Sequence, residues 1–292
     1  MKALKADALN GGTRGFARAV WRTDPLLCGA SLLLLLVFAG TVAGLVLDPR
    51  VIMGAPAWLK PAKFAISTSI YTLTLAWVFT HLKEWPRTRR VVGGLTVTVM
   101  LIEVAIVSLQ AARGATSHFN VATPFDAVLF AVMGLAIVTQ TLATIAVAVA
   151  LWRQRFDDRA MGVALRVGMT LSILGASVGG AMTARPTDAQ LAEARLTGRL
   201  TTAGAHTVGG PDGGPGLPGV GWSTTHGDLR VPHFFGLHAL QALPIFVFLL
   251  GRRPERWRMR FTWAAAAVYA VVFLFLLAQA ATGIPLMVGG AR

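Results

Sequence analysis

Seven stretches of this chain are each long and apolar enough to cross a membrane as a helix, and no other feature constrains the fold as strongly. A bilayer core requires about 20 consecutive apolar residues in a helix. Only 14% of the residues are charged, against roughly 25% in a soluble domain. The sequence therefore predicts an all-α integral membrane bundle over residues 25–292, preceded by a basic tail over residues 1–24. The seven stretches are residues 25–47, 64–82, 91–111, 127–152, 161–183, 231–250 and 261–287.

The basic residues concentrate in every second segment between these stretches. Five lie in the tail, four in residues 83–90, three in residues 153–160 and five in residues 251–260, together 17 of the 27 Lys and Arg. Seven crossings place these four segments on one side, and the positive-inside rule makes that side cytoplasmic. We therefore expect the N-terminus in the cytoplasm and the C-terminus outside. The net charge of +14 then indicates contact with membrane lipids and not with nucleic acid.

The first apolar stretch excludes two other interpretations of the chain. It follows basic residues as a signal peptide does, but it is longer than the 7–15 residues of a typical signal core, which favours a retained helix. It also holds the single cysteine, Cys28. The chain therefore has no internal disulfide and no cysteine-based metal site.

Residues 184–230 form the one long connection between apolar stretches. Thr187 and Gln190 have capping-box spacing, which predicts a short helix ending at about Gly198. Residues 206–222 are crowded with Gly and Pro, which predicts consecutive turns without a regular element. The connection is either a flexible linker or an ordered lid whose glycines allow close approach of the backbone.

Residues able to do chemistry gather in the half of the bundle predicted to lie outside. His233 and His238 are five residues apart, about 140° around a helix, so they do not share a face. His238 and Gln241 are three apart and do share one. Only one of the six histidines, His81, falls at the inner boundary. The five outer histidines are His118, His206, His226, His233 and His238.

Three carboxylates are candidate catalytic groups on the same side. Glu103 lies near the middle of the third apolar stretch, where a carboxylate costs a few kcal/mol and is rare without a reason. Asp126 either caps the following helix or acts with His118 as an acid–base pair or metal ligand. Asp228 precedes Pro232 and either balances the positive end of that helix or joins the site. Nine basic residues lie on the side that usually avoids them, and four of these could pair with a carboxylate or face an anionic headgroup, namely Lys60, Lys63, Arg113 and Arg230.

The favoured hypothesis is a metal or haem site near the outer face. A zinc or copper ion would be bound by His118, His233 and His238, whereas haem b would take His118 and His238 as axial ligands. Zinc with an open position would activate water for hydrolysis of an amphiphilic or anionic substrate. The catalytic groups would be Glu103, Asp126 and Asp228. The residues predicted to bind the small-molecule or lipid substrate are Lys60, Lys63, Arg113, Asn120, Arg230 and Gln241.

Two alternatives belong to other functional classes, so the pattern leaves open whether the chain is an enzyme. In the first, the protein is a proton-coupled transporter in which Glu103 takes and releases the proton. The absence of an internal repeat counts against this alternative. In the second, the protein is a non-catalytic scaffold or sensor that acts through residues 184–230.

Three strings in the chain resemble those of a family of bacterial seven-helix inner-membrane proteins. They are RGATSHFN, HTVGGPDGGPGLPGVGWSTTHGDLR and HFFGLHALQALP. The resemblance would cover most of the chain. It implies a location in the bacterial inner membrane but no activity, and it transfers no functional residue.

A weaker similarity is to the membrane metal hydrolases of the ceramidase and adiponectin-receptor type, which also combine seven helices with several histidines and an aspartate. That family uses a His-x-x-x-His pair on one late helix. Four residues separate His233 from His238, so the motif is absent. The similarity is one of type and assigns no zinc ligand here.

Overall fold

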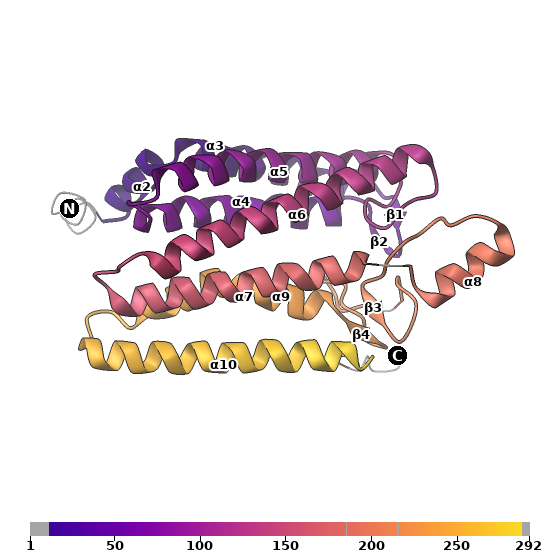
Figure 1. The fold of residues 1–292 in the computed structure, drawn as a ribbon. Helices are drawn as coiled ribbons and strands as arrows, with labels where there is room; N and C mark the ends of the chain where they lie inside the picture. Colours follow the sequence, from indigo (N-terminus) through magenta and orange to yellow (C-terminus); the bar gives the residue numbers. More distant parts are fainter. Residues whose placement is uncertain (1–11, 185, 215, 288–292) are drawn as a thin grey trace.

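The structure is a computed structural model that describes residues 12–184, 186–214 and 216–287 (Figure 1). Seven helices in this part of the chain are long and apolar enough to span a membrane, so the predicted multi-pass helical bundle is confirmed at that level. They are α3 (Pro25–Leu47), α4 (Leu59–His81), α5 (Pro86–Ala112), α6 (Pro124–Arg153), α7 (Arg159–Thr183), α9 (Arg230–Leu249) and α10 (Glu255–Ala281).

The predicted starts of three helices are wrong, and the third helix begins at Pro86 and not at residue 91. The second helix starts at Leu59 and not at residue 64, so Lys60 and Lys63 lie within its first turns. Pro61 is compatible with this start because the first turn of a helix needs no N–H from it. The seventh helix covers Glu255–Ala281 and not residues 261–287. In all three cases polar residues near the helix start were read as loop.

The spanning helices form two groups that lie side by side (Figure 1). Helices α3, α4, α5 and α6 pack on one another in the N-terminal group, and α7, α9 and α10 in the C-terminal group. The principal contact between the groups is α6 against α7. A shared apolar core also joins them, since Leu75 of α4 and Leu240 of α9 belong to one cluster of buried side chains.

Helices α7 and α9 approach each other unusually closely. A Cβ atom added to Gly175 would lie 2.7 Å from the backbone of Gly236, and one added to Gly236 would lie 2.5 Å from the Cα of Gly175. Between these contacts Ser172 Oγ donates to the carbonyl oxygen of Leu237 over 3.0 Å. Small residues that let helix backbones meet are a principal means of helix association in lipid.

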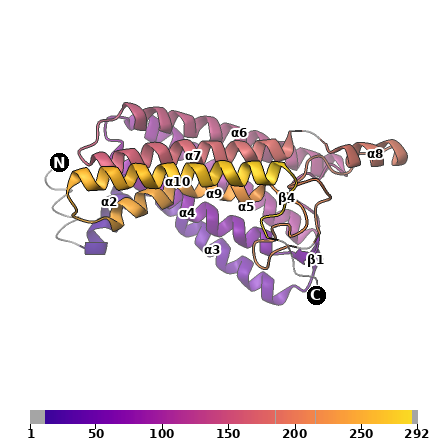
Figure 2. The same cartoon turned by 90° about the horizontal axis from the view of Figure 1, so that it is seen from below.

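The connections collect at two ends of the bundle (Figure 1). Residues 48–58, 113–123, 184, 186–214, 216–229 and 282–287 lie at one end, which we call the loop end. Residues 82–85, 154–158 and 250–254 lie at the opposite end. Figure 2 shows that α8 (Asp188–Thr197) projects beyond the bundle at the loop end.

Several short elements refine the predicted connections. The capping box of Thr187 and Gln190 at the start of α8 is confirmed, and Gly198 ends this helix with a φ of 70°. The basic tail contains a helix that was not predicted, α2 (Gly12–Thr23); Lys2 and Lys5 lie outside the described residues. Two short antiparallel pairs complete the fold: β1 (Val51–Ile52) with β2 (Ala55–Pro56), and β3 (Thr207–Val208) with β4 (Gly227–Asp228).

The strand β3 corrects the expectation that residues 206–222 contain no regular element. Its partner β4 lies at Gly227–Asp228, beyond the Gly/Pro-rich segment, so no pattern within that segment could reveal the pair. The carbonyl oxygen of Gly283, after α10, accepts a 2.7 Å hydrogen bond from the Gly227 N–H. The long connection is thus attached to the end of α10.

Candidate functional site

Charged and histidine side chains from well-separated parts of the sequence come together at the loop end. Lys60 interacts electrostatically with Glu103, Asp212 and Arg230. His118 interacts with Lys60, His206 and His233. We call this group the loop-end cluster and define it as Lys60, Lys63, Glu103, His118, His206, Asp212, Asp228, Arg230 and His233.

Lys60 is the cation of this cluster that has no direct partner. Its side chain is half-buried, and it makes no hydrogen bond or ion pair with the residues that the structure describes. It lies in the first turn of α4, whose N-terminus receives no side-chain cap. Because this end of a helix carries a partial positive charge and free N–H groups, a nearby cation is disfavoured and an anion is favoured.

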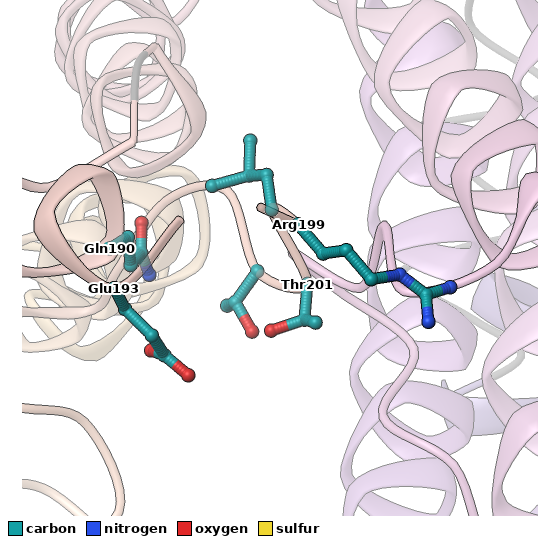
Figure 3. A pocket seen from close by; sticks show the side chains of 6 residues that line it. Gln190, Glu193, Arg199 and Thr201 are labelled. Atoms are coloured by element: carbon teal, nitrogen blue, oxygen red, sulfur yellow. The ribbon is translucent and has the colours of Figure 1, made fainter. Parts of the chain in front are cut away.

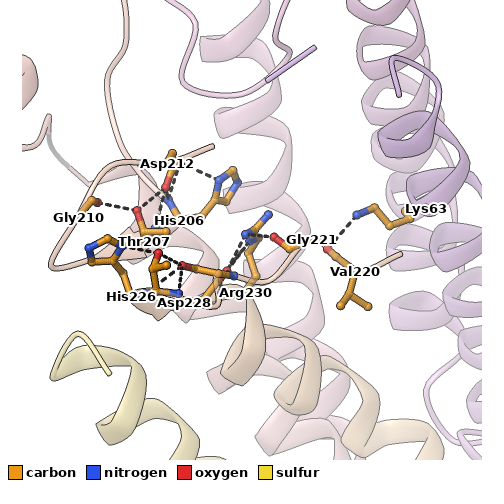
Figure 4. A network of polar contacts seen from close by, with 12 residues as sticks. Lys63, His206, Thr207, Gly210, Asp212, Val220, Gly221, His226, Asp228 and Arg230 are labelled. Atoms are coloured by element: carbon orange, nitrogen blue, oxygen red, sulfur yellow. Dashed lines mark hydrogen bonds and ion pairs between the residues drawn. The ribbon is translucent and has the colours of Figure 1, made fainter. Parts of the chain in front are cut away.

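The two neighbouring cations, Lys63 and Arg230, already have hydrogen-bond partners. Lys63 Nζ donates to the carbonyl oxygen of Val220 over 3.1 Å. Arg230 donates to both carboxylate oxygens of Asp228, with a shortest distance of 2.6 Å, and to the carbonyl oxygen of Gly221 over 2.6 Å. Figure 4 shows these side chains holding the Gly/Pro-rich segment against α4 and α9. The segment thus lies over the loop end of one helix from each group, and we call residues 206–214 and 216–222 the covering segment.

Glu103 is the deepest ionisable member of the cluster. Its side chain is only 1% exposed, and neither carboxylate oxygen has a hydrogen-bond partner among the described residues. Lys60 is the charged residue that acts on it. A buried carboxylate without hydrogen bonds is costly in its ionised form, because no dipole replaces the water it has lost.

His206 and Asp212 form the polar centre of the covering segment (Figure 4). Asp212 Oδ2 lies 2.9 Å from His206 Nδ1, and Asp212 also accepts the N–H groups of His206 and Thr207. Although burial opposes it, the hydrogen bonds from His206 and Thr207 hold the pKa of Asp212 well below its ordinary range. Burial lowers the pKa of His206, and burial with the positive charge of Lys60 holds the pKa of His118 well below its ordinary range. Both imidazoles are therefore neutral at neutral pH.

Acidification is expected to loosen the His206–Asp212 centre in two stages. Folding lowers the pKa of His206, so the folded state binds a proton there less readily than the unfolded chain does. The contribution of His206 to the free energy of unfolding is therefore complete above the ordinary histidine pKa of 6.5 and decreases as the pH falls below that value. Asp212 keeps its contribution until the pH falls below its ordinary value of 3.8. Hydrogen exchange at the amides of His206 and Thr207, expressed as protection factors, should show protection that falls as the pH decreases below about 6.5. A His206→Gln variant should lack this stage; unchanged protection in the parent down to the acid range would contradict the expectation.

Phe119 links two histidines of the cluster through a strained backbone. Its φ is 64°, in the left-handed region that non-glycine residues rarely adopt. Its buried ring lies edge-on to His206, with ring centroids 4.7 Å apart, and at 6.3 Å from His118. Ala203 N–H donates to the Phe119 carbonyl oxygen over 2.8 Å and holds the loop in place. Strain of this kind concentrates at functional sites.

Asp126 and Arg113 have structural partners beside the cluster. Helix α6 begins at Pro124, so Asp126 lies in its first turn and Thr123, not Asp126, is the residue that caps it. Asp126 accepts hydrogen bonds from Gln110 Nε2 at 2.8 Å, Arg113 at 2.7 Å and Thr123 Oγ1 at 2.6 Å. Arg113 also contacts Gln110 directly. This buried network joins α5 to α6.

Asn120 stabilises the turn that contains it. Its side-chain amide donates to the carbonyl oxygen of Thr116 over 3.1 Å, and its Oδ1 accepts from the N–H of Ala122 over 3.1 Å. These bonds use one donor and one acceptor of the amide within its own loop. Asn120 therefore fixes the backbone next to Phe119.

His238 and Gln241 lie apart from His118 and His206. His238 Nδ1 is 2.8 Å from the carbonyl oxygen of Phe234, and its ring lies 4.0 Å from the Phe234 ring. The Gln241 amide lies 3.3 Å from Thr74 Oγ1 of α4. His233 faces α7 instead, with Nδ1 2.7 Å from the carbonyl oxygen of Gly175.

The three histidines of the metal hypothesis thus have different hydrogen-bond partners, although His233 interacts electrostatically with both His118 and His238. In the part of the chain that the structure describes, no group of three or more His, Cys, Asp and Glu side chains is arranged to hold a metal ion. The metal and haem assignments of His118, His233 and His238 therefore gain no geometric support. Sequence reasoning missed His206 and Asp212 as site residues. Their spacing across a glycine-rich turn was the available signal, but the pattern has no established meaning.

A shallow recess lies elsewhere at the loop end, between α8 and the segment that follows it (Figure 3). Its charged side chains do not converge, since Glu193 and Arg199 extend in different directions in Figure 3. It is lined by Gln190, Glu193, Arg199, Leu200, Thr201 and Thr202. None of these residues belongs to the loop-end cluster, so the recess is not the candidate site.

Comparisons with protein-family models, with curated proteins and with solved structures gave no match to this chain. The function is therefore argued from the loop-end cluster.

Proposed function

We propose that this multi-pass protein binds an anionic group at Lys60, on the outer face of a bacterial inner membrane. The group is the phosphate, sulfate or carboxylate of a small molecule or of a lipid headgroup. The proposed sidedness rests on the 17 basic residues of the tail and of residues 83–90, 153–160 and 251–260, which the positive-inside rule assigns to the cytoplasm.

The unpaired ammonium of Lys60 is the observation that carries this proposal. A half-buried cation in a low-dielectric setting gains most from a direct anionic partner. The described residues supply none, since Asp212 is tied to His206 and Asp228 to Arg230. Glu103, the remaining carboxylate, makes no ion pair with Lys60.

The start of α4 adds a second contribution to anion binding. No side chain caps this helix, and Pro61 lies within its first turn. The N–H groups that precede Pro61 belong to residues 59 and 60, at the positive end of the helix dipole. An anion at Lys60 would lie where these N–H groups and the ammonium act together.

The test is binding of sulfate and of inorganic phosphate to the detergent-purified protein, measured by titration calorimetry, in the parent and in Lys60→Met. We expect Lys60→Met to weaken binding at least tenfold, because a hydrogen bond to a charged group contributes roughly 1.5–3 kcal/mol. The matched control is Lys83→Met, at the exposed opposite end of α4, which should bind like the parent.

A second arm separates the two sources of the anionic group. The parent and both variants are incorporated into nanodiscs of phosphatidylglycerol or of phosphatidylcholine, and thermal stability is measured. Stabilisation by phosphatidylglycerol that is lost in Lys60→Met indicates a headgroup, whereas binding of the soluble ions alone indicates a free anion. If neither ion nor lipid distinguishes Lys60→Met from Lys83→Met, the anion site is wrong.

A further inference from the structure

We propose that Glu103 takes up a proton when an anion binds at Lys60, so that the site binds an anion and a proton together. This coupling rests on the proposed anion site. The coupling adds a second ligand to that site, namely a proton on the carboxyl group of Glu103. This group lies deep in α5, below the place where the anion contacts the protein.

The charges of the loop-end cluster support the coupling. Three cations, Lys60, Lys63 and Arg230, face two carboxylates, Asp212 of the covering segment and Asp228 of β4. An ionised Glu103 would bring this group of charges to neutrality without any ligand. A singly charged anion at Lys60 would also bring it to neutrality, but only if Glu103 were protonated, and a dianion such as sulfate opposes an ionised Glu103 still more strongly. Since a partly buried cluster is most stable near neutrality, the anion and the Glu103 charge exclude each other.

The surroundings of Glu103 make its ionised form depend on Lys60. Neither carboxylate oxygen accepts a hydrogen bond from a described residue, so the field of a nearby cation is the main source of stabilisation left. That cation is Lys60 of α4. An anion paired with Lys60 cancels most of this field at Glu103, and the ionised carboxylate then loses what stabilised it.

No other charged group from the helices around Glu103 replaces Lys60. Helix α3 contains no charged residue along its length, and α6 has Asp126 and Arg153 only near its ends. Asp126 is moreover tied to Arg113. On α5 itself the remaining charges, Arg87, Arg89 and Arg90, lie in the first turns at the opposite end. The histidines of the cluster, among them His118, act on Lys60 and on one another.

The experiment is titration calorimetry with sulfate in buffers of different ionisation enthalpy, which gives the number of protons taken up for each anion bound. Sulfate is used because it does not titrate near neutral pH. We expect about one proton for each sulfate in the parent, and an affinity that falls about tenfold for each pH unit in the range where free Glu103 is ionised. In Glu103→Gln we expect sulfate to bind with almost no proton uptake and little dependence on pH.

A second measurement uses the parent protein alone, so it does not depend on whether a variant folds. Infrared difference spectra recorded on sulfate addition should gain the carbonyl stretch of a protonated carboxylic acid. Sulfate binding without proton uptake, or with uptake that persists in Glu103→Gln, would overturn the coupling while leaving the anion site intact. Absence of sulfate binding to the parent would overturn both, and the two failures are therefore distinguishable.

Discussion

Replacement of Gly175 by leucine is expected to separate α7 from α9 and to prevent the protein from reaching its folded state in detergent. A side chain at this position has no room, because its Cβ would lie 2.7 Å from the backbone of Gly236. A backbone cannot move aside as a flexible side chain can, so the cost should exceed the roughly 1–3 kcal/mol of ordinary overpacking. The same change would separate Ser172 Oγ from the Leu237 carbonyl oxygen. Size-exclusion profiles and thermal stability of the purified protein measure the effect.

Gly180→Leu is the matched control. Gly180 lies on the same helix, and a Cβ there would have nothing within 4 Å. The Gly180→Leu protein should be monodisperse and should have nearly the parent's melting temperature, because leucine favours a helix more than glycine does. A Gly175→Leu protein as stable as Gly180→Leu would show that α7 and α9 are not packed backbone to backbone.

Asp126→Ala is expected to lower the free energy of unfolding by about 2 kcal/mol, the typical cost of losing hydrogen bonds to a charged group. Asp126 is 4% exposed and accepts hydrogen bonds from Gln110, Arg113 and Thr123. Its removal leaves the fully buried amide of Gln110 with fewer partners, while the Arg113 guanidinium can still reach water because it is 37% exposed. Thermal unfolding monitored by circular dichroism measures the loss.

The Asp188→Ala variant is the control, because it also removes a carboxylate from the first turn of a helix. Asp188 also lies in the first turn of a helix, but it is exposed, so its removal should cost only a few tenths of a kcal/mol. Equal losses in the two variants would mean that the Asp126 network contributes nothing beyond the helix dipole. Sulfate affinity at Lys60 should change little in either variant.

The fold was predictable because lipid imposes a simple requirement on the backbone. Each spanning segment must satisfy its own hydrogen bonds, so length and apolarity suffice to find it. The errors fell where polar residues begin a helix, as at Lys60 and at Glu255. Helix α2 was missed for a similar reason, since it lies in a basic tail that composition alone describes as charged.

The candidate site was only partly predictable from the sequence. Glu103 and Lys60 could be selected singly, because each is an unusual residue at its depth or on its side of the bundle. His206 and Asp212 could not, since their pairing depends on how a glycine-rich segment turns back on itself. The grouping of His233 with His118 depends on how the helices pack, which periodicity does not specify.

The division of the helices into two groups has a consequence for how such a protein can evolve. Lys60, Glu103 and His118 come from the N-terminal group, whereas Arg230 and His233 belong to the C-terminal one. Neither half can therefore diverge independently without losing the charge balance that spans them. Residues 154–158, which connect the halves, lie at the end opposite the cluster. Selection on this chain should thus act on pairs of positions in different halves, such as 60 with 230, more strongly than on neighbours in sequence.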